Sequence, residues 1–495
     1  MTFSKITGVA FLFLAVALLW LANAPVISNP PFDRHSFRQS QTLSTIELYY
    51  RDGIDLLHPA TNYQGEPGYF VLELPLFQAA AALLFRVFGD SIAVVRIFNI
   101  LITLASCGMT YLISRKLLSP IGAMVAALIF ISAPLNLGYM AAVLLDPLGI
   151  FCALSTFYVG WEILEGRRST GRYVLFGVLA CLVALIKALY LFPVLVLMGV
   201  WFLSEGRKAY RPLAVMFAWL VVAGVGFLAW SWHAKSVNNA SFFTAGVLPT
   251  SHLGYSMLTG TAWYKVIAKR LLWDCVGPLA GILIVVGWVC SGITTTRTGN
   301  WRGERIALLT LGVTVGYWFA FADINYPHDY YSLVTVPFLS IAAAAAIQRL
   351  TQRREALVVA IGLCTVGVSA VFYAKKRWAI PSEPLMTLQR EAGQSFHRWD
   401  YAMVFVDHAK CPSVTPGNEF PAGLYALGLR GTGKCVASAN QAVEIFQRFA
   451  PHYQHLQYVV FYGMEPVPHI ANGFPHTVVS NATEQIYGFE VAPVP

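Results

Sequence analysis

The chain has 495 residues, of which 57% are hydrophobic and only 12% are charged. Soluble domains carry about 25% charged residues, so this composition excludes an ordinary soluble protein and makes lipid the solvent for much of the chain. Many of the basic residues behind the formal charge of +9 fall in short loops between apolar runs. This pattern indicates membrane topology, and we predict no nucleic-acid partner.

The apolar runs are nearly continuous, about 18–22 residues long and without alternation, which favours membrane-spanning helices over barrel strands. We therefore predict a mainly α fold, a polytopic membrane bundle of about eleven transmembrane helices. The first run, Ile6 to Ile27, also fits a signal peptide, but its length favours an uncleaved helix. The predicted helices lie near residues 6–26, 92–113, 121–138, 142–163, 173–190, 191–204, 212–232, 276–295, 305–322, 331–347 and 357–374.

The loops between these helices alternate in charge, and this alternation predicts their side of the membrane. Short loops rich in arginine and lysine belong in the cytoplasm by the positive-inside rule, together with the N-terminus. If the run 70–89 crossed the membrane, every later loop would lie on the opposite side and the basic loops would lie outside. We therefore expect this run to form a helix at the outer interface. The segments expected outside are 28–90, 233–274, 323–330 and everything after about 375.

This topology predicts a membrane-embedded domain, 1–375, and a small extracytoplasmic α/β domain, 376–495. An exported domain permits a disulfide between Cys411 and Cys435, and two free thiols are the alternative. The other six cysteines lie in or beside apolar runs, where cysteine behaves as a small hydrophobe. The elements expected in the second domain are buried strands at 401–406 and 458–462 and a helix at 439–450.

The first outer loop carries the densest polar cluster, Asp33-Arg34-His35-Ser36-Phe37-Arg38-Gln39-Ser40-Gln41-Thr42. A solvated loop also gathers such residues by chance. However, a carboxylate suits the deprotonation of a sugar hydroxyl, and arginine suits bidentate phosphate binding. The cluster is therefore a candidate site of catalysis or phosphate binding.

Three further polar positions lie near the outer ends of predicted helices. A charged side chain such as that of Asp146 has a high energetic cost in a membrane. It therefore indicates a functional site, or else it caps its helix. Lys187 stands where two helices turn back, and it either reaches the interface or holds a lipid phosphate. His328 accompanies Tyr330 and Tyr331 in a short outer loop, where interfacial tyrosines are common.

The predicted topology collects these polar residues at one face of the membrane. Asp33, Glu73, Asp146, Lys187 and His328 come from distant parts of the chain, and all five fall at the outer face. A carboxylate base with cations at this face suits a lipid-phosphate substrate whose chemistry takes place at the interface.

The order of these features resembles that of the membrane-embedded GT-C glycosyltransferases, in the branch of protein O-mannosyltransferases and lipid A aminoarabinose transferases. The resemblance covers most of residues 1–350 and is strongest to bacterial proteins with a D-x-H-x-x-R-Q-x-x-T pattern. The matching residues are Asp33, His35, Arg38, Gln39 and Thr42, then Gly53 and Pro59, Glu73-Leu74-Pro75-Leu76-Phe77, Leu145-Asp146-Pro147-Leu148, Lys187 and His328-Asp329-Tyr330-Tyr331.

The resemblance implies an inverting transfer of a sugar from a polyprenyl-phosphate donor to an acceptor hydroxyl at the outer face of the inner membrane. The loop aspartate, here Asp33, would deprotonate the acceptor. The implied partners are the lipid-linked sugar, membrane lipid, and a glycolipid, polysaccharide or protein acceptor. The residues implied for the donor phosphate and substrate are Arg34, His35, Arg38, Gln39, Asp146, Lys187, His328, Tyr330 and Tyr331.

The chain departs from the best-known members of that branch in two places. Those members carry Asp-Glu shortly before the G…P of the loop, which is Gly53 and Pro59 here. Counting back from Gly53 without a gap places Arg38-Gln39 at the position of that Asp-Glu. Glu73-Leu74-Pro75 also replaces their Lys-Pro-Pro or His-Pro-Pro, so Glu73 is the alternative base. A divalent metal stays open, because carboxylates and His35 offer ligands but no local spacing supports a site.

Two other functions compete with glycosyl transfer. A transporter or flippase of lipid-linked glycans would show internal repeats and polar groups at mid-membrane, and the sequence has neither pattern. A non-catalytic scaffold would leave the cluster around Asp33 and Glu73 without a role.

Overall fold

The computed structural model divides the chain into two compact units. The structure describes residues 14, 16–17, 23–244, 254–298, 304–376, 381–411 and 414–490, so most of the predicted helix 6–26 lies outside the described residues. Unit 1 comprises Met1–Ile27, Arg96–Trp230 and Thr250–Trp378, and unit 2 comprises Ser28–Val95, Ser231–Pro249 and Ala379–Pro495.

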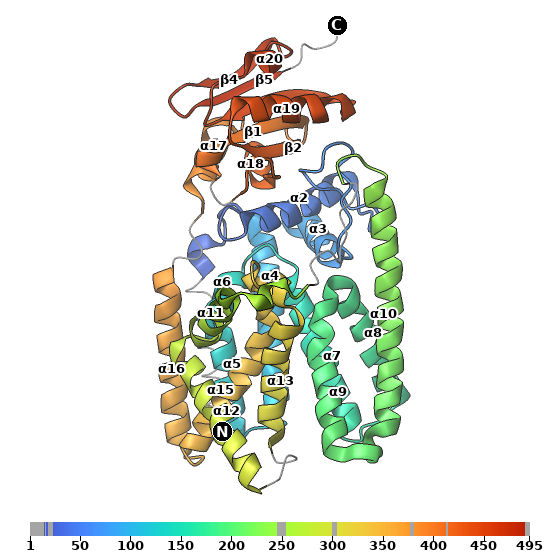
Figure 1. Ribbon diagram of the computed structural model, residues 1–495, viewed down its shortest axis with the longest axis vertical. Coiled ribbons are helices and arrows are strands. Elements are labelled where there is room, and N and C mark those ends of the chain that lie inside the picture. The colour runs from blue at the N-terminus through green and yellow to red at the C-terminus, as the bar shows by residue number, and fades with distance from the viewer. Residues whose placement is uncertain are drawn as a thin grey trace. The chain divides into compact units, whose positions relative to one another are not determined.

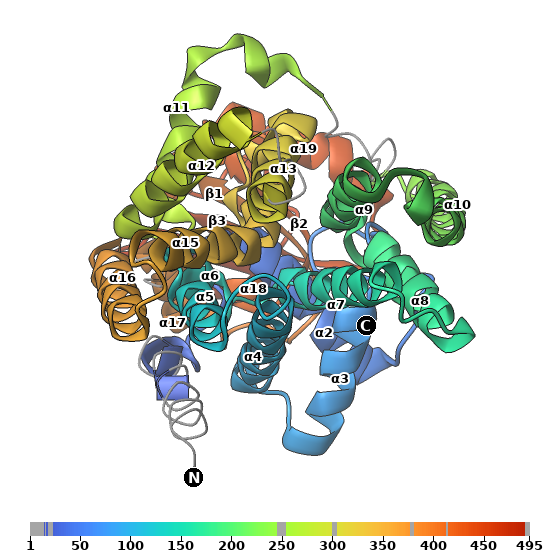
Figure 2. The same cartoon turned by 90° about the horizontal axis from the view of Figure 1, so that it is seen from below.

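Unit 1 is a bundle of apolar helices that run beside one another (Figure 1, Figure 2). Short 3-10 segments join several of them, notably η2 (Ala188–Leu191), η3 (Gly206–Ala209) and η7 (Asp329–Thr335). The helices that form the bundle are α4 (Ile92–Ser114), α5 (Pro120–Ser132), α6 (Pro134–Tyr139), α7 (Asp146–Leu164), α8 (Thr170–Lys187), α9 (Phe192–Glu205), α10 (Tyr210–Asn239), α11 (Thr261–Lys269), α12 (Pro278–Thr298), α13 (Arg305–Ala320), α14 (Ala322–Asn325), α15 (Val336–Leu350) and α16 (Glu355–Lys376).

These helices make the protein a multi-pass membrane protein. Within the described part of the chain, five stretches are long and apolar enough to cross a membrane, or six if a pair bent by 110° counts as one span. One of the five, Thr170–Asn239, is 70 residues long and contains α8, α9 and α10. The mainly helical fold is therefore confirmed, while the count of eleven spans stays a prediction.

Local sequence explains where several helices begin and end. The predicted run 121–138 divides into α5 and α6 at Pro134, because proline lacks an N–H donor and disfavours the helical conformation in the residue before it. Ser119 caps α5 by accepting a hydrogen bond from Gly122 N, and Ser169 caps α8 in the same way from Arg172 N.

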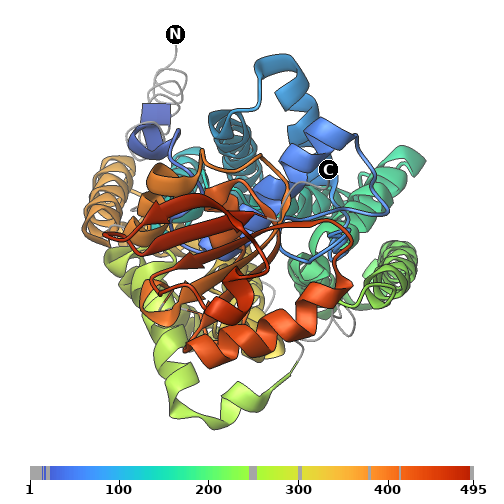
Figure 3. The ribbon, with the colours of Figure 1, turned by 90° about the horizontal axis from the view of Figure 1, so that it is seen from above.

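The C-terminal part of unit 2 contains a mixed sheet whose strands lie side by side in the order β2-β1-β3-β5-β4 (Figure 3). β1 pairs in parallel with β2 and β3, whereas β5 pairs antiparallel with β3 and β4. The elements are α17 (Glu383–Ala392), β1 (Tyr401–Asp407), α18 (Pro421–Leu427), β2 (Arg430–Val436), α19 (Ala439–Phe449), β3 (Leu456–Tyr462), α20 (Pro468–Ala471), β4 (His476–Asn481) and β5 (Ile486–Glu490).

Side chains of β1 enter two separate cores, one on each face of the sheet. Val404 and its alternate neighbours join one buried cluster, and Met403 and Phe405 join the other. This is the two-residue period of a strand that is buried on both faces. The strands predicted at 401–406 and 458–462 are thus confirmed as β1 and β3, and the predicted helix as α19. The predicted Cys411–Cys435 disulfide is also confirmed.

The first outer loop belongs to the same unit as this sheet. Phe32, Tyr63 and Phe70 lie in the buried cluster that contains Val404. Backbone bonds reinforce the contact, since Gly65 N donates to Gly431 O over 2.7 Å. The structure therefore groups loop 28–90 with the C-terminal region, and the predicted domain boundary at 375 stays a prediction.

The two helices of this loop are α2 (Ser36–Asp52) and α3 (Leu76–Phe88). α3 has 13 residues, too few to span a membrane. One of its faces buries Phe77 and Phe85, while Val87 is 72% exposed. A short helix with a buried face and exposed apolar residues fits the predicted helix at the interface.

Candidate functional site

Asp33 lies in the turn that leads into α2. His35 adopts the left-handed conformation, with φ of 56°, and this allows the chain to turn directly into the helix. The side-chain amide of Gln39 then donates hydrogen bonds to Asp33 Oδ1 and, over 2.8 Å, to the backbone oxygen of Arg34. A buried amide thus orients the Asp33 carboxylate through a neutral donor.

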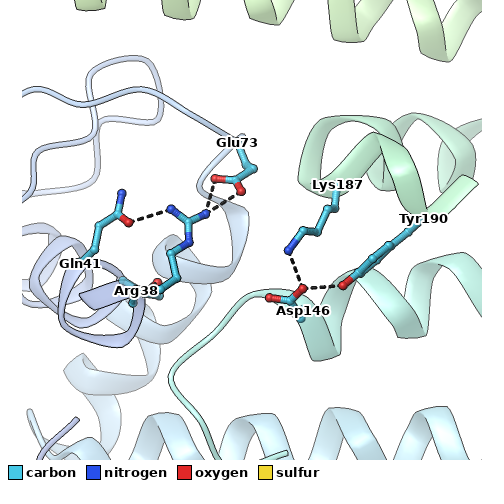
Figure 4. A network of polar contacts seen from close by, with 7 residues as sticks. Arg38, Gln41, Glu73, Asp146, Lys187 and Tyr190 are labelled. Atoms are coloured by element: carbon cyan, nitrogen blue, oxygen red, sulfur yellow. Dashed lines mark hydrogen bonds and ion pairs between the residues drawn. The ribbon is translucent and has the colours of Figure 1, made fainter. Parts of the chain in front are cut away.

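Arg38, one turn into α2, joins the loop to the segment before α3. Its Nη2 donates to both oxygens of Glu73 over 2.6 and 2.7 Å, and its Nη1 donates to Gln41 Oε1 over 2.7 Å (Figure 4). Glu73 is 24% exposed and Arg38 17% exposed, so both side chains are largely withdrawn from water. Glu73 is therefore a carboxylate that an arginine already holds.

A second polar network lies in unit 1, where α7 begins and α8 ends. Lys187 Nζ donates to Asp146 Oδ1 over 2.5 Å, and the hydroxyl of Tyr190 donates to the same oxygen (Figure 4). Asp146 is 2% exposed and Lys187 5% exposed, so the ion pair is buried. Pro147 follows Asp146 in the first turn of α7, a position that proline favours.

The aromatic loop, which contains His328, Tyr330 and Tyr331, packs against this ion pair. Lys187 Nζ lies 4.0 Å from the ring centre of Tyr331 and 4.9 Å from that of Tyr330. His328 stands beside both rings, at 5.4 and 6.0 Å between centroids. Stacked tyrosines against a buried ammonium gain a cation–π interaction that water does not screen.

Buried polar groups that the sequence interpretation passed over shape this network. On α4, Arg96 Nη1 donates to Ala141 O over 3.0 Å, and Asn99 Nδ2 donates to Ala142 O over 2.6 Å and Leu144 O over 3.0 Å. These bonds hold the non-helical segment that leads to Asp146. An ionisable residue inside a predicted membrane span was the signal that would have found Arg96.

A second buried arginine bonds to the backbone just before the loop that contains His328, Tyr330 and Tyr331. Arg270, which is 5% exposed, donates to the backbone oxygens of Asn325 and Tyr326, just before His328. It belongs to a short π-helical segment, Arg270–Asp274, a geometry that is common at functional sites. The sequence interpretation treated this stretch as loop and missed the arginine.

The structure thus gathers the predicted residues into two groups, one in each unit. Their common location at one membrane face stays a prediction. Unit 2 holds Asp33, Arg34, His35, Arg38, Gln39 and Glu73, and unit 1 holds Asp146, Lys187, His328, Tyr330 and Tyr331.

The question of a metal stays open. Among the described residues, the His, Cys, Asp and Glu side chains grouped closely enough to hold an ion are His408, Cys411 and Cys435. The two cysteines of this group are joined in the disulfide, which removes their thiolates as ligands. The carboxylates named in the sequence interpretation do not form such a group there.

Comparisons with known proteins bear on this arrangement. A family model described as dolichyl-phosphate-mannose-protein mannosyltransferase matches residues 72–233. A curated relative from Edwardsiella ictaluri is named undecaprenyl phosphate-alpha-4-amino-4-deoxy-L-arabinose arabinosyl transferase. It is 26% identical over 314 residues, which cover 60% of this chain and 54% of the relative. The match therefore spans about half the length of that relative.

Solved structures match over a greater length. The crystal structure of ArnT from Cupriavidus metallidurans in the apo state covers 100% of both chains, with a TM-score of 0.64 and 13% identity. The chain has the GT-C fold. The same ArnT bound to undecaprenyl phosphate matches with a TM-score of 0.63 and 12% identity, over 98% of this chain and 99% of ArnT. The oligosaccharyltransferase AglB from Archaeoglobus fulgidus matches with a TM-score of 0.55 and 11% identity, over 98% of this chain and 74% of AglB.

The predicted resemblance to the GT-C glycosyltransferases is confirmed by these matches. Together with the apolar helices, the GT-C fold supports a multi-pass protein of the inner membrane. The side on which each terminus lies stays a prediction.

Proposed function

We propose that the chain is an inverting glycosyltransferase that moves a sugar from a polyprenyl-phosphate donor to an acceptor hydroxyl at the outer face of the inner membrane. The observation that carries the proposal is the fold match, over 98% of the chain, to a protein crystallised with undecaprenyl phosphate. The names of the curated relative and of the family model each contain a polyprenyl phosphate, undecaprenyl or dolichyl, together with a sugar. These names favour the same class of donor here.

In the proposed reaction, Asp33 removes the proton from the acceptor hydroxyl. The acceptor oxygen forms a bond to the anomeric carbon of the donor sugar, while the bond from that carbon to the phosphate oxygen breaks. The lipid phosphate leaves with the electron pair, and Asp33 keeps the proton. Gln39 fixes the carboxylate for this step through its amide.

The ion pair with Arg38 favours Asp33 over Glu73 as the base. Both Glu73 oxygens accept hydrogen bonds from one guanidinium nitrogen, and these bonds stabilise the ionised carboxylate and occupy its lone pairs. A base for a sugar hydroxyl needs an oxygen that can take a proton. We therefore assign Glu73 to the support of Arg38 at the start of α2.

For the donor, we propose that Lys187 supplies positive charge to the phosphate. The bond to Asp146 fixes the position of the Lys187 ammonium, and the rings of Tyr330 and Tyr331 cover it. A fixed cation in a water-poor site stabilises the charge that develops on a leaving phosphate.

The alternation of basic loops supports the proposed orientation. It puts the N-terminus in the cytoplasm and the C-terminal domain outside. The alternative function, a transporter or flippase of lipid-linked glycans, receives no support from the relatives.

The test is glycosyl transfer by the purified full chain in proteoliposomes. A panel of polyprenyl-phosphate sugars serves as donor and membrane extract as acceptor, and the release of polyprenyl phosphate is measured. We expect wild type and the matched control Asp52→Asn, at the end of α2, to be active, and Asp33→Asn to be inactive. Movement of lipid-linked sugar between leaflets without any transfer would overturn the proposal in favour of a transporter.

A further inference from the structure

A cavity of about 600 Å³ opens beside α17 and α18 in unit 2. None of the described residues that line it carries a carboxylate side chain. The side chains that matter for its chemistry are Gln389, Arg390, Gln394, Arg398, Trp399 and Tyr425.

The two arginines give the cavity a preference for anions. Arg390 and Arg398 are 63% and 56% exposed, so their guanidinium groups reach solvent. Arg390 Nε bonds to Glu391, and Arg398 Nη2 bonds to Glu47. Each guanidinium has five N–H donors, so these bonds orient it and leave others for a phosphate or carboxylate.

The remaining side chains suit a sugar ring. Trp399 and Tyr425 meet edge to face at 6.2 Å, which provides apolar ring surface beside the cations. Gln389 and Gln394 add amide donors and acceptors for hydroxyl groups. Trp399 has a φ of 70°, a strained conformation for a residue other than glycine, and such strain clusters at binding sites.

Direct contacts join this cavity to the loop that carries Asp33. The ring of Phe32, the residue before Asp33, lies 6.3 Å from that of Tyr425. Ser382, just before α17, donates from its backbone N to Phe32 O over 2.7 Å. Glu47 of α2 accepts from Tyr425 over 2.6 Å as well as from Arg398. A ligand in the cavity therefore sits on the same rigid framework as the proposed base.

We propose that this cavity binds the acceptor through a sugar that bears a phosphate or a carboxylate. The inference rests on the proposed glycosyl transfer, because only that reaction makes the ligand an acceptor. The same anionic sugar is found on a glycolipid headgroup or as a free sugar, and the experiment separates these two sources.

Binding is measured first, by calorimetry on the full chain in a neutral detergent. The probes are glucose 1-phosphate and glucuronate, with glucose as the uncharged control. We expect wild type to bind the two anions and not glucose, and Arg390→Gln to weaken that binding about tenfold or more. Arg448→Gln, an exposed arginine of α19 outside the cavity, is the matched control and should bind as wild type.

Two results overturn the proposal: equal affinity for glucose and its phosphate, or unchanged binding in both Arg390→Gln and Arg398→Gln. Arg398→Gln also removes the bond from Arg398 to Glu47 and could weaken α2. In that case the result for Arg390→Gln alone decides. Vesicles that contain an anionic glycolipid replace the free sugars in a second arm, and tighter binding there identifies a headgroup as the source.

Transfer is measured separately, so that the two proposals fail in different ways. We expect Arg390→Gln to raise the KM for the acceptor, and the control Arg448→Gln to leave that KM unchanged. If wild type binds the anions but transfers no sugar, the cavity stands as an anionic-sugar site and the proposed function fails. If transfer proceeds with an unchanged acceptor KM in Arg390→Gln, the cavity does not hold the acceptor.

Discussion

Lys187 Nζ and Asp146 Oδ1 lie 2.5 Å apart in a pair that is almost completely buried. The two residues are separated by 41 positions in the chain. α7 and α8 are consecutive and pack against each other, so the start of the first helix meets the end of the second. Two residues that each looked costly in a membrane therefore neutralise each other.

We predict that Lys187→Met lowers the free energy of unfolding by about 3–5 kcal/mol, because it leaves the Asp146 carboxylate buried without its counter-ion. Thermal and denaturant unfolding in detergent measure this effect. The double variant Lys187→Met with Asp146→Asn should regain most of the stability but remain inactive. A double variant as unstable as the single one would contradict a direct pairing.

The bond between Arg38 and Glu73 makes a second prediction. Asp33→Asn should lower kcat about 10³-fold, as expected for the loss of a general base. Glu73→Gln should lower kcat only about tenfold and reduce stability by about 1–3 kcal/mol, because Arg38 loses a charged acceptor in a half-buried position. Steady-state kinetics and unfolding of both variants test this. If Glu73→Gln is the inactive variant, the base is Glu73.

Gly65 tests the close contact between the outer loop and Phe243. It has a φ of +63°, and a Cβ there would lie 2.3 Å from the ring of Phe243. Gly65→Ala should therefore add overpacking of about 1–3 kcal/mol to a backbone cost of about 1–2 kcal/mol. Gly428→Ala is the control, since Gly428 has a φ of +70° and its Cβ would make only an ordinary contact, 3.5 Å from Arg398. Equal loss of stability in both variants would argue against the contact.

Glu419 should make the stability of unit 2 depend on pH. Burial raises the pKa of Glu419 from 4.5 to about 7, although Lys434 lies 2.6 Å away and opposes the change. The folded state then holds a proton that the unfolded state releases above pH 4.5. Stability should therefore fall as the pH rises from about 4.5 to about 7, by at most about 1.4 kcal/mol per pH unit.

Unfolding of wild type and Glu419→Gln across this pH range measures the effect. The side chain is 21% exposed, so water reduces the size of the change below that maximum. Glu419→Gln should show a flatter pH profile, whereas Glu444→Gln, at an exposed position on α19, should keep the wild-type profile. Parallel profiles for all three proteins would remove Glu419 as the cause.

The disulfide between Cys411 and Cys435 closes a loop with a sequence separation of 24. The chain-entropy model gives such a loop about 3 kcal/mol of stabilisation. Cys411→Ser with Cys435→Ser should lower the melting temperature of the full chain, and a reducing agent should lower that of wild type alone. Cys364→Ser, which removes an exposed free thiol, is the control. A melting temperature unchanged by reduction would show that the crosslink adds little.

Elements whose signal is local could be predicted from the sequence alone. The run 92–113 became α4, Ile92–Ser114, because a continuous apolar stretch must form its own backbone hydrogen bonds in lipid. The segment 401–406 became β1 for a similar reason, since its apolar residues fit a sheet that is covered on both faces. The cluster after Asp33 was also visible, because its charged residues are adjacent in the chain.

Which of these residues meet depends on the packing of distant segments. Arg38 pairs with Glu73 across 35 positions, and Phe32 packs on Tyr425 from the other end of the chain. Hydropathy and spacing carry no record of such pairs, because contact between distant segments depends on how whole helices and strands pack. Glu73 is an example: its sequence motif made it the alternative base, its contact with Arg38 could not be read from the sequence, and its role stays a prediction.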